Sequence, residues 1–264
     1  MTSRLQLDRQ GPVATIWIDR ADKRNALDGA AMRELGVALD DVGADRAIRV
    51  VVLRGKGPVF STGIDTTLLA EVFGATQGTP WLHLHHQLQD VFHRMARLHQ
   101  PVIAAMHGVC IGMALELALA ADLRLATEDC VLGLPEIAFG IVPDVGGTTR
   151  LVRAVGEPRA RDLILTGRLI KARTAERYGM VHDVVADVAG LEARITERVT
   201  QLATHPATAL GLAKALVTAS ADADAATSFR LEGVVQQALL AQPGLMGAFP
   251  AALAFIKAQL AAAE

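Results

Sequence analysis

The stretch P-V-I-A-A-M-H-G-V-C-I-G-M-A-L-E-L-A-L-A-A-D, residues 101–122, decides the fold. It is the most apolar run of the 264-residue chain and is long enough to cross a bilayer. A membrane span is disfavoured because Glu116 would be costly in lipid, and because Gly108 and Gly112 divide the run into two short pieces. We therefore expect a buried strand followed by a buried helix, and no membrane association.

The same alternation of strand and helix extends on both sides of this stretch. Apolar, β-branched runs predict strands at 12–19 and 48–55. Asp28 is placed to cap a helix that follows it, and residues 81–99 predict a long helix that ends before Pro101. Helical spacing dominates beyond residue 190. The sequence thus predicts an α/β core over residues 1–190 and an all-helical region over residues 191–264.

Composition excludes several functional classes. The formal net charge is −2 and no basic stripe is present, which disfavours nucleic-acid binding. Two cysteines, Cys110 and Cys130, without a C-x-x-C pair disfavour a disulfide framework or a zinc site and fit a reducing, cytoplasmic setting. The first ten residues contain no apolar segment, so no signal peptide is expected.

Four stretches combine small residues with chemically active ones: D-K-R-N-A-L (22–27), F-S-T-G-I-D (60–65), H-G-V-C-I-G-M-A-L-E-L-A (107–118) and L-P-E-I-A-F-G-I-V-P-D-V-G-G-T (134–148). Their acids have structural as well as functional interpretations. Glu116 could be a core carboxyl satisfied by an arginine or by backbone amides. Glu136, directly after Pro135, could complement a helix N-terminus, and Asp144 could cap the helix after the glycine pair.

Other catalytic patterns are weak or missing. His83 and His86 have helical i, i+3 spacing, but no acidic or cysteine partner is evident nearby, so we expect a solvated or pocket-rim face and no metal. Ser61 does not lie in a G-x-S-x-G elbow, which disfavours a serine hydrolase. The chain also has no G-x-G-x-x-G or Walker pattern.

Taken together, the motifs resemble those of the enoyl-CoA hydratase/isomerase (crotonase) family over nearly the whole chain. The resemblance is carried by R-x-x-K-R-N-A-L, F-S-x-G-x-D, H-G-x-x-x-G-x-x-x-E-L-A-L-A-A-D, P-E-x-x-x-G-x-x-P-D-x-G-G-T-x-R-L and a final segment that ends in A-x-x-Y-G-M-V. It implies an α/β fold of the crotonase type, a spiral of β-β-α units with a helical C-terminal region that makes homotrimers, often paired into hexamers.

The resemblance also implies a substrate and a mechanism. The family binds acyl-CoA thioesters and stabilises an enolate with two backbone N–H groups, which by position are those of Ile64 and Met113. A glycine is more usual at the second position, so the Met113 side chain could narrow the pocket. The two carboxylates of hydratases match Glu116 and Glu136, which are 20 residues apart. One would activate water and the other would protonate the α-carbon, with no metal and no cofactor, since coenzyme A is part of the substrate.

Further positions match family residues that contact the substrate. Lys23 and Arg24 match the turn that contacts CoA, although each could be an ordinary surface cation. Asp65 could equally cap the following helix. The full set of implied substrate-binding residues is Lys23, Arg24, Ala26, Thr62, Gly63, Asp65, Leu68 and Gly112. Trp81, Leu84 and Leu88 match the helix that borders the acyl pocket.

Asp144 leaves the reaction open. Typical hydratases have a glycine at this position, whereas dienoyl-CoA isomerases of the family have an aspartate that moves protons. The resemblance therefore implies an enoyl-CoA hydratase with Glu116 and Glu136 as catalytic groups. The alternative is an enoyl-CoA or dienoyl-CoA isomerase that uses Asp144 as a third acid, and a non-catalytic acyl-CoA binder is a further alternative.

Overall fold

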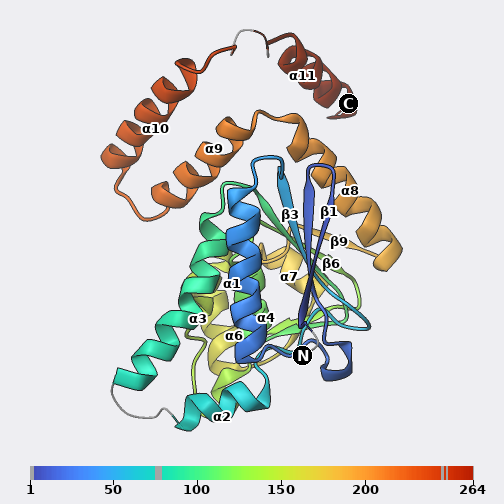
Figure 1. The fold of residues 1–264 in the computed structure, drawn as a ribbon, viewed down its shortest axis with the longest axis vertical. Helices are drawn as coiled ribbons and strands as arrows, with labels where there is room; N and C mark the ends of the chain where they lie inside the picture. The colour runs from blue at the N-terminus through green and yellow to red at the C-terminus, as the bar shows by residue number, and fades with distance from the viewer. Residues whose placement is uncertain (1–2, 75–78, 245–246, 248, 264) are drawn as a thin grey trace. The chain divides into compact units, whose positions relative to one another are not determined.

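The structure is a computed structural model that describes residues 3–74, 79–244, 247 and 249–263. Its main feature is a six-stranded sheet with the order β1-β2-β3-β4-β6-β9 (Figure 1). The first two strands pair antiparallel, and every later neighbour pairs parallel. The strands are β1 (Leu5–Gln10), β2 (Val13–Ile18), β3 (Val50–Gly55), β4 (Val102–Met106), β6 (Leu123–Thr127) and β9 (Asp183–Val185).

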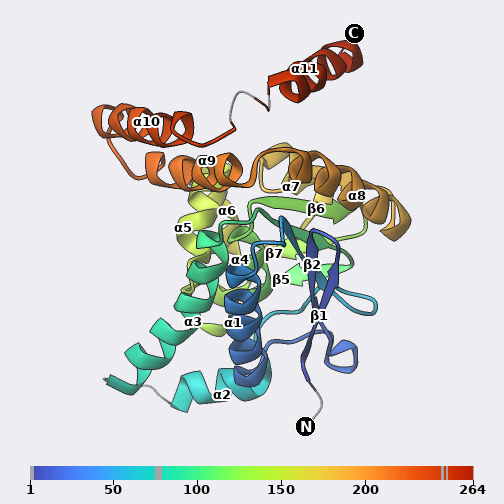
Figure 2. The same ribbon diagram turned by 45° about the horizontal axis from the view of Figure 1, so that its top comes forward.

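A second, smaller sheet has three strands. It consists of β5 (Val109–Ile111), β7 (Val131–Gly133) and β8 (Ile170–Lys171), in the order β5-β7-β8. Strands β5 and β7 are visible in Figure 2. The apolar stretch 101–122 contributes a strand to each sheet, β4 to the large one and β5 to the small one. The helix α4 (Met113–Leu119) follows β5 directly.

Helices cover both faces of the large sheet, which explains why its central strands are apolar throughout. On one face Val51 and Leu53 belong to the main core with α1 (Gly29–Ala44) and α3 (Thr79–Arg97). On the other face Val50 and Val52 pack with α8 (Val188–Thr204). The helices α1 and α3 lie side by side in Figures 1 and 2.

The remaining helices of the first 206 residues are short. They are the 3-10 helices η1 (Ala21–Lys23) and η2 (Glu136–Phe139), and the α-helices α2 (Thr66–Gly74), α5 (Gly147–Val155), α6 (Glu157–Thr166) and α7 (Ala172–Tyr178). The C-terminal segment contains α9 (Ala207–Ser220), α10 (Ala225–Leu240) and α11 (Phe249–Ala263).

The chain divides into two compact units, Met1–Ala207 and Thr208–Glu264. The first unit contains both sheets, and the second is helical throughout its described secondary structure. The predicted order of an α/β core followed by helices is therefore observed. Among the described helices, none combines the length and the apolar character that a bilayer crossing requires.

Candidate active site

Glu116 is a buried carboxyl on a buried helix. Every residue of α4 is buried, and Glu116 is only 2% exposed. Its Oε1 accepts a hydrogen bond of 2.8 Å from the backbone N–H of Gly147, at the start of α5. A Cβ atom at residue 147 would lie 2.7 Å from the carboxyl carbon of Glu116, so only glycine allows this approach. The predicted backbone partner of Glu116 is thus found, and the glycine pair has a structural purpose.

Glu136 lies on η2, and it is near enough to Glu116 for its charge to act on that carboxyl. Its Oε1 is 3.2 Å from the point where a Cβ on Gly112 would stand, and Gly112 is the residue before α4. Its other oxygen, Oε2, is buried and has no hydrogen-bond partner within the described residues. Leaving a buried carboxyl oxygen without a hydrogen bond costs folding free energy, so this atom is a candidate for contact with a ligand or water.

The pKa values of both glutamates are displaced toward neutrality. Burial, followed by repulsion from Glu136, raises the pKa of Glu116 to about 8. Burial, together with the charge of Asp144, raises the pKa of Glu136 to about 7. Because two like charges at close range cannot both ionise easily, the pair tends to hold one proton around these pH values. One group can then act as an acid while the other acts as a base.

Asp144 is a member of this acidic cluster and does not cap a helix. The cap residue of α5 is Gly146, and it makes no side-chain cap hydrogen bond, so the capping alternative for Asp144 is wrong. Burial raises the pKa of Asp144, and its own charge in turn raises the pKa of Glu116 and Glu136. The structure therefore brings the three predicted acids together.

Two backbone N–H groups, those of Ile64 and Met113, were predicted to form the oxyanion hole. Leu27 pairs with the segment around Ile64, donating to the Gly63 carbonyl (2.8 Å) and accepting from the Asp65 N–H (2.9 Å). In this parallel pairing the N–H of Ile64 points away from Leu27, and no acceptor for it is present within the described part of the chain. Met113 is the first residue of α4, where N–H groups lack intrahelical acceptors.

The two N–H groups are neighbours in space. A Cβ on Gly63 would lie 3.2 Å from the Met113 nitrogen and 2.6 Å from the Ile111 carbonyl oxygen, so glycine permits this close approach. The Met113 side chain itself packs in the main hydrophobic core. The arrangement of Ile64 and Met113 matches what an oxyanion hole requires, namely two preorganised donors.

The predicted CoA-binding turn is rigid and presents two cations to solvent. Arg24 and Asn25 both have left-handed backbone conformations, with φ values of 51° and 56°. Asn25 is fully buried, and its side-chain amide donates to the carbonyls of Lys56 (2.7 Å) and Val59 (2.8 Å). Lys23 and Arg24 are exposed on this turn. Asn25 was not predicted as a site residue, although an Asn with φ above zero is a typical turn anchor.

Arg20 connects this turn to the segment that carries Ile64. Its guanidinium pairs with Asp28 (3.2 Å) and with Asp65 (3.1 Å), and it donates to the Ala26 carbonyl. Arg20 is the first residue of the R-x-x-K-R-N-A-L motif but was not predicted as a site residue. Its partner Asp65 lies 45 residues further along the chain, so no local pattern indicated that contact.

The other predicted substrate-binding residues differ in their surroundings. Thr62 donates its N–H to the Arg24 carbonyl (3.1 Å) and joins the turn to the Ile64 segment. The Asp65 carboxylate accepts from Thr67 N–H (2.9 Å), as the capping alternative predicted, and Leu68 is fully buried in the core. Ala26 donates its N–H to Lys23 and its carbonyl accepts from Arg20.

The helix α3 places its histidines in different surroundings, with His83 and His86 on the exposed face that the sequence predicted. His83 and His86 are exposed, and the described residues contain no cluster of three potential metal ligands. His85 contacts one of the acids, Asp144, because its Nε2 lies 3.1 Å from the Asp144 carbonyl oxygen and 3.5 Å from the carboxylate Oδ2. Leu88 is buried, and Leu84 packs against the core.

Comparison with known proteins places this geometry in context. The sequence profile described as "Enoyl-CoA hydratase/isomerase" matches residues 8–247. A "probable enoyl-CoA hydratase" of Rhizobium meliloti is 36% identical over 237 residues, which is 90% of each chain. The crystal structure of an enoyl-CoA hydratase from Bacillus anthracis has a TM-score of 0.86 at 32% identity, covering 94% of this chain and 96% of that one.

A third relative was solved with a bound thioester. The Thermobifida fusca protein in complex with acetoacetyl-CoA has a TM-score of 0.80 at 36% identity. The alignment covers 90% of this chain and 95% of that one.

Proposed function

The chain belongs to the enoyl-CoA hydratase/isomerase family, and from this premise we propose that it adds water across the double bond of a 2-enoyl-CoA thioester. The profile match and the similar structures confirm the family and the crotonase-type α/β fold that the motifs predicted. The single observation that carries the proposed reaction is the proximity of two glutamates shielded from water, the buried Glu116 and the half-buried Glu136, whose Oε1 reaches the residue before α4.

In this proposal the substrate is an acyl-CoA thioester. The exposed cations Lys23 and Arg24 suit the phosphates of CoA, and the rigid backbone around Asn25 holds them in place. The complex of the Thermobifida fusca relative with acetoacetyl-CoA supports this choice of ligand. Thr62 and Gly63 remain the best candidates beside the adenine, because Leu68 is buried and the Asp65 carboxylate is used by Thr67 and Arg20.

The thioester oxygen would be held by the N–H groups of Ile64 and Met113. As water attacks C3, negative charge develops on this oxygen, and each well-placed donor is worth about 3 kcal/mol in the transition state. One glutamate takes a proton from the attacking water, and the other delivers a proton to C2, so the product is a 3-hydroxyacyl-CoA. The reaction needs no metal and no cofactor beyond the CoA that the substrate carries.

A test of this proposal uses crotonyl-CoA and the purified protein. We expect the conjugated-enoyl absorbance to fall and 3-hydroxybutyryl-CoA to form. Glu136→Gln, which keeps the size of the side chain but cannot exchange protons, should lower kcat by about 100-fold or more. Near-full activity of this variant would remove Glu136 from the mechanism. Binding without turnover of any enoyl-CoA, measured by calorimetry, would instead support a non-catalytic acyl-CoA binder.

Asp144 supports double-bond isomerisation as a second candidate activity. A third acid in the cluster could take a proton from C4 of a bound 2-enoyl-CoA, while another carboxyl returns a proton to C2. The product is a 3-enoyl-CoA, with no oxygen added. In D2O the forward step places deuterium on C2 and its reversal places deuterium on C4, whereas hydration alone does not label C4. A panel of 2-enoyl-, 3-enoyl- and dienoyl-CoA substrates therefore separates the two activities.

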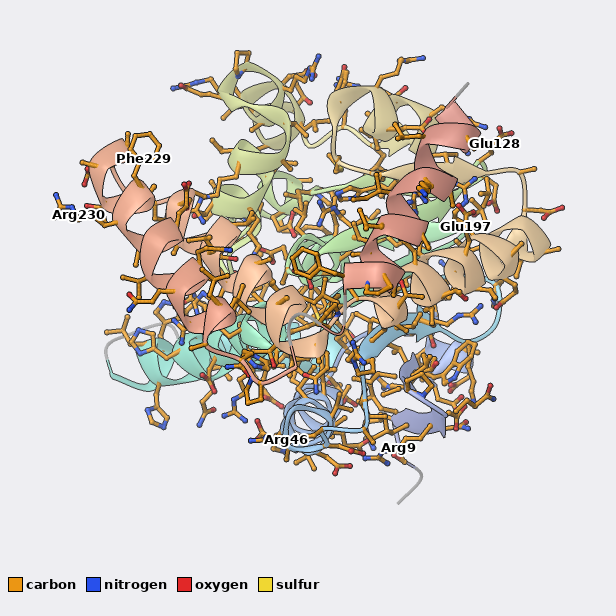
Figure 3. The ribbon with its side chains drawn as sticks, turned by 90° about the horizontal axis from the view of Figure 1, so that it is seen from above. Arg9, Arg46, Glu128, Glu197, Phe229 and Arg230 are labelled. Atoms are coloured by element: carbon orange, nitrogen blue, oxygen red, sulfur yellow. The ribbon has the colours of Figure 1, made fainter. Side chains whose placement is uncertain are left out.

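We further propose that the protein assembles as a homotrimer or a dimer of trimers through its C-terminal helices. The second unit exposes large apolar side chains that a monomer would leave in water. Phe229 on α10, labelled in Figure 3, points away from its helix and is 69% exposed. Phe249, Leu253, Ile256 and Leu260 on α11 are also exposed.

A further inference from the structure

One face of α3 is directed at the main chain of Asp144. His85 and Gln89 are one helical turn apart, and each places its Nε2 on the Asp144 carbonyl oxygen, at 3.1 Å and 2.9 Å. A carbonyl oxygen only accepts, so the His85 Nε2 must carry a hydrogen. These two donors occupy both lone pairs of the carbonyl and fix the peptide that carries Asp144.

His85 differs from Gln89 because it also approaches the carboxylate. Its Nε2 lies 3.5 Å from Oδ2 of Asp144, so one N–H group serves the backbone and the side chain of the same residue. The Trp81 ring, one turn earlier on α3, stacks on the imidazole with ring centroids 5.3 Å apart. The imidazole is thus held on one side by Trp81 and on the other by Asp144.

We propose that His85 is a positioning residue that orients the Asp144 carboxylate and stabilises it in its charged form, so that Asp144 can accept a proton from C4 of a bound 2-enoyl-CoA. The inference rests on the isomerase activity proposed above. His85 does not touch the reacting atoms and acts through Asp144.

The charges around Asp144 explain why such a partner is needed. Glu116 faces it from α4 and Glu136 from η2, and both disfavour another negative charge. Burial raises the pKa of Asp144, and His85, from α3, acts in the opposite direction and lowers it. Arg150, from α5, donates to the Val145 carbonyl (3.1 Å), and its charge acts on Glu116. His85 therefore opposes the burial that would otherwise keep Asp144 protonated.

The experiment follows hydration and C4 exchange in one sample. Crotonyl-CoA is incubated with the full-length protein in D2O, and NMR records both the 3-hydroxy product and the loss of the C4 methyl protons. His85→Asn and His85→Gln form a matched pair that differs by one methylene. The Gln amide nitrogen can take the place of Nε2, whereas the Asn amide falls short of Asp144. Gln89→Leu removes the other donor to the carbonyl, and His83→Gln serves as a surface control.

We expect His85→Asn to slow C4 exchange about tenfold in kcat with little change in KM, and to leave hydration within about twofold of the wild type. On its acidic side, the pH profile of C4 exchange should move to higher pH, because Asp144 then stays protonated to higher pH. His85→Gln should restore most of the exchange. Gln89→Leu should leave the acidic side of the exchange profile at the same pH, because Gln89 contacts only the carbonyl of Asp144.

Two results would overturn the inference. If Asp144→Asn abolishes C4 exchange but His85→Asn leaves both the rate and the acidic side of the exchange profile unchanged, Asp144 works without His85 and only this inference fails. If Asp144→Asn leaves C4 exchange unchanged, the proposed isomerase role fails and the role of His85 fails with it. Thermal denaturation of each variant confirms that it is folded.

Discussion

Glu116 and Glu136 have carboxyl pKa values near neutrality because Glu116 is buried, Glu136 is half-buried, and both are close to other acids. Hydration needs one of them charged and the other protonated. We therefore predict that kcat/KM for crotonyl-CoA has a bell-shaped pH profile. It should fall below about pH 7, where both become protonated, and above about pH 8, where both become ionised. A profile that stays flat from pH 5 to 9 would contradict this assignment.

The same burial should make the charged form of Glu116 costly for the folded state. Its folded pKa of about 8 lies above the ordinary value of 4.5. The free energy of unfolding therefore has its full value with respect to this group below pH 4.5, and it falls as the pH rises toward 8. Glu116→Gln keeps an oxygen for the Gly147 N–H and carries no charge. We predict that this variant is more stable than the wild type at pH 8, on the order of 3 kcal/mol.

Thermal melting across pH tests this prediction, because the difference in Tm between the two proteins should shrink toward pH 4.5. Asp162→Asn is a suitable comparison, since Asp162 lies at the surface in an ion pair with Arg168. Its Tm difference from the wild type should not grow with rising pH above neutrality. If Glu116→Gln were less stable than the wild type at pH 8, burial would not be the cause of the raised pKa.

At the scale of elements, Asp28 joins a helix to the turn that we propose binds CoA. Its Oδ1 accepts from the Ala31 N–H (2.8 Å) and caps α1, and its Oδ2 pairs with Arg4 and Arg20. We predict that Asp28→Asn retains the cap and that Asp28→Ala loses about 1 kcal/mol more of stability, measured by urea unfolding. Both variants release Arg20 from one partner, so both should raise KM for crotonyl-CoA. An unchanged KM would show that Arg20 does not hold the turn.

Most elements could be predicted from the sequence, and those that could not have physical explanations. The central strands β3 and β4 are apolar throughout, and Asp28 is a strong capping residue, so their predicted positions are close to those observed. The strand β1 was missed because L-Q-L-D-R-Q is a half-exposed edge strand with no clear apolar run. Its hydrogen bonds to β2 stabilise it more than its composition does.

The rotation of α3 about its axis was also beyond local sequence reasoning. The run H-L-H-H offered three histidines with similar spacing, and the pair His83 and His86 was singled out. The structure instead directs His85 to Asp144, because Leu88, Val91 and Phe92 are buried in the core and fix which side of the helix faces inward. The rotation of a helix about its axis is set by its packing against elements that are distant in the chain.

For the whole molecule, the acidic cluster could be found from sequence because the motifs preserve order and spacing. Glu116, Glu136 and Asp144 come from three separate segments, and only the resemblance to a family indicated that they meet. What the motifs could not reveal is which distant residues hold the motif side chains in place, as Asp65 does for Arg20 and Val59 does for Asn25. A functional site was thus more predictable than the contacts that hold it in shape.

The exposed apolar stripe on α11 leads to a prediction about assembly. Phe249, Leu253, Ile256 and Leu260 recur at helical spacing and are exposed, which is unfavourable unless another surface covers them. We predict a solution mass of three or six times the 27.9 kDa of one chain by light scattering. The double variant Leu253→Glu with Ile256→Glu should lower this mass, because charges at a buried interface are costly.

The control for this experiment is Ala254→Glu, which adds a charge to an exposed position of α11 away from the stripe. It should leave the mass unchanged. If the wild type has the mass of a single chain, or if both substitutions reduce the mass equally, then the stripe is not the contact between copies. Because the proposed catalytic groups all lie in the first unit, Met1–Ala207, any loss of activity that follows the loss of mass would show that the active site depends on the assembly.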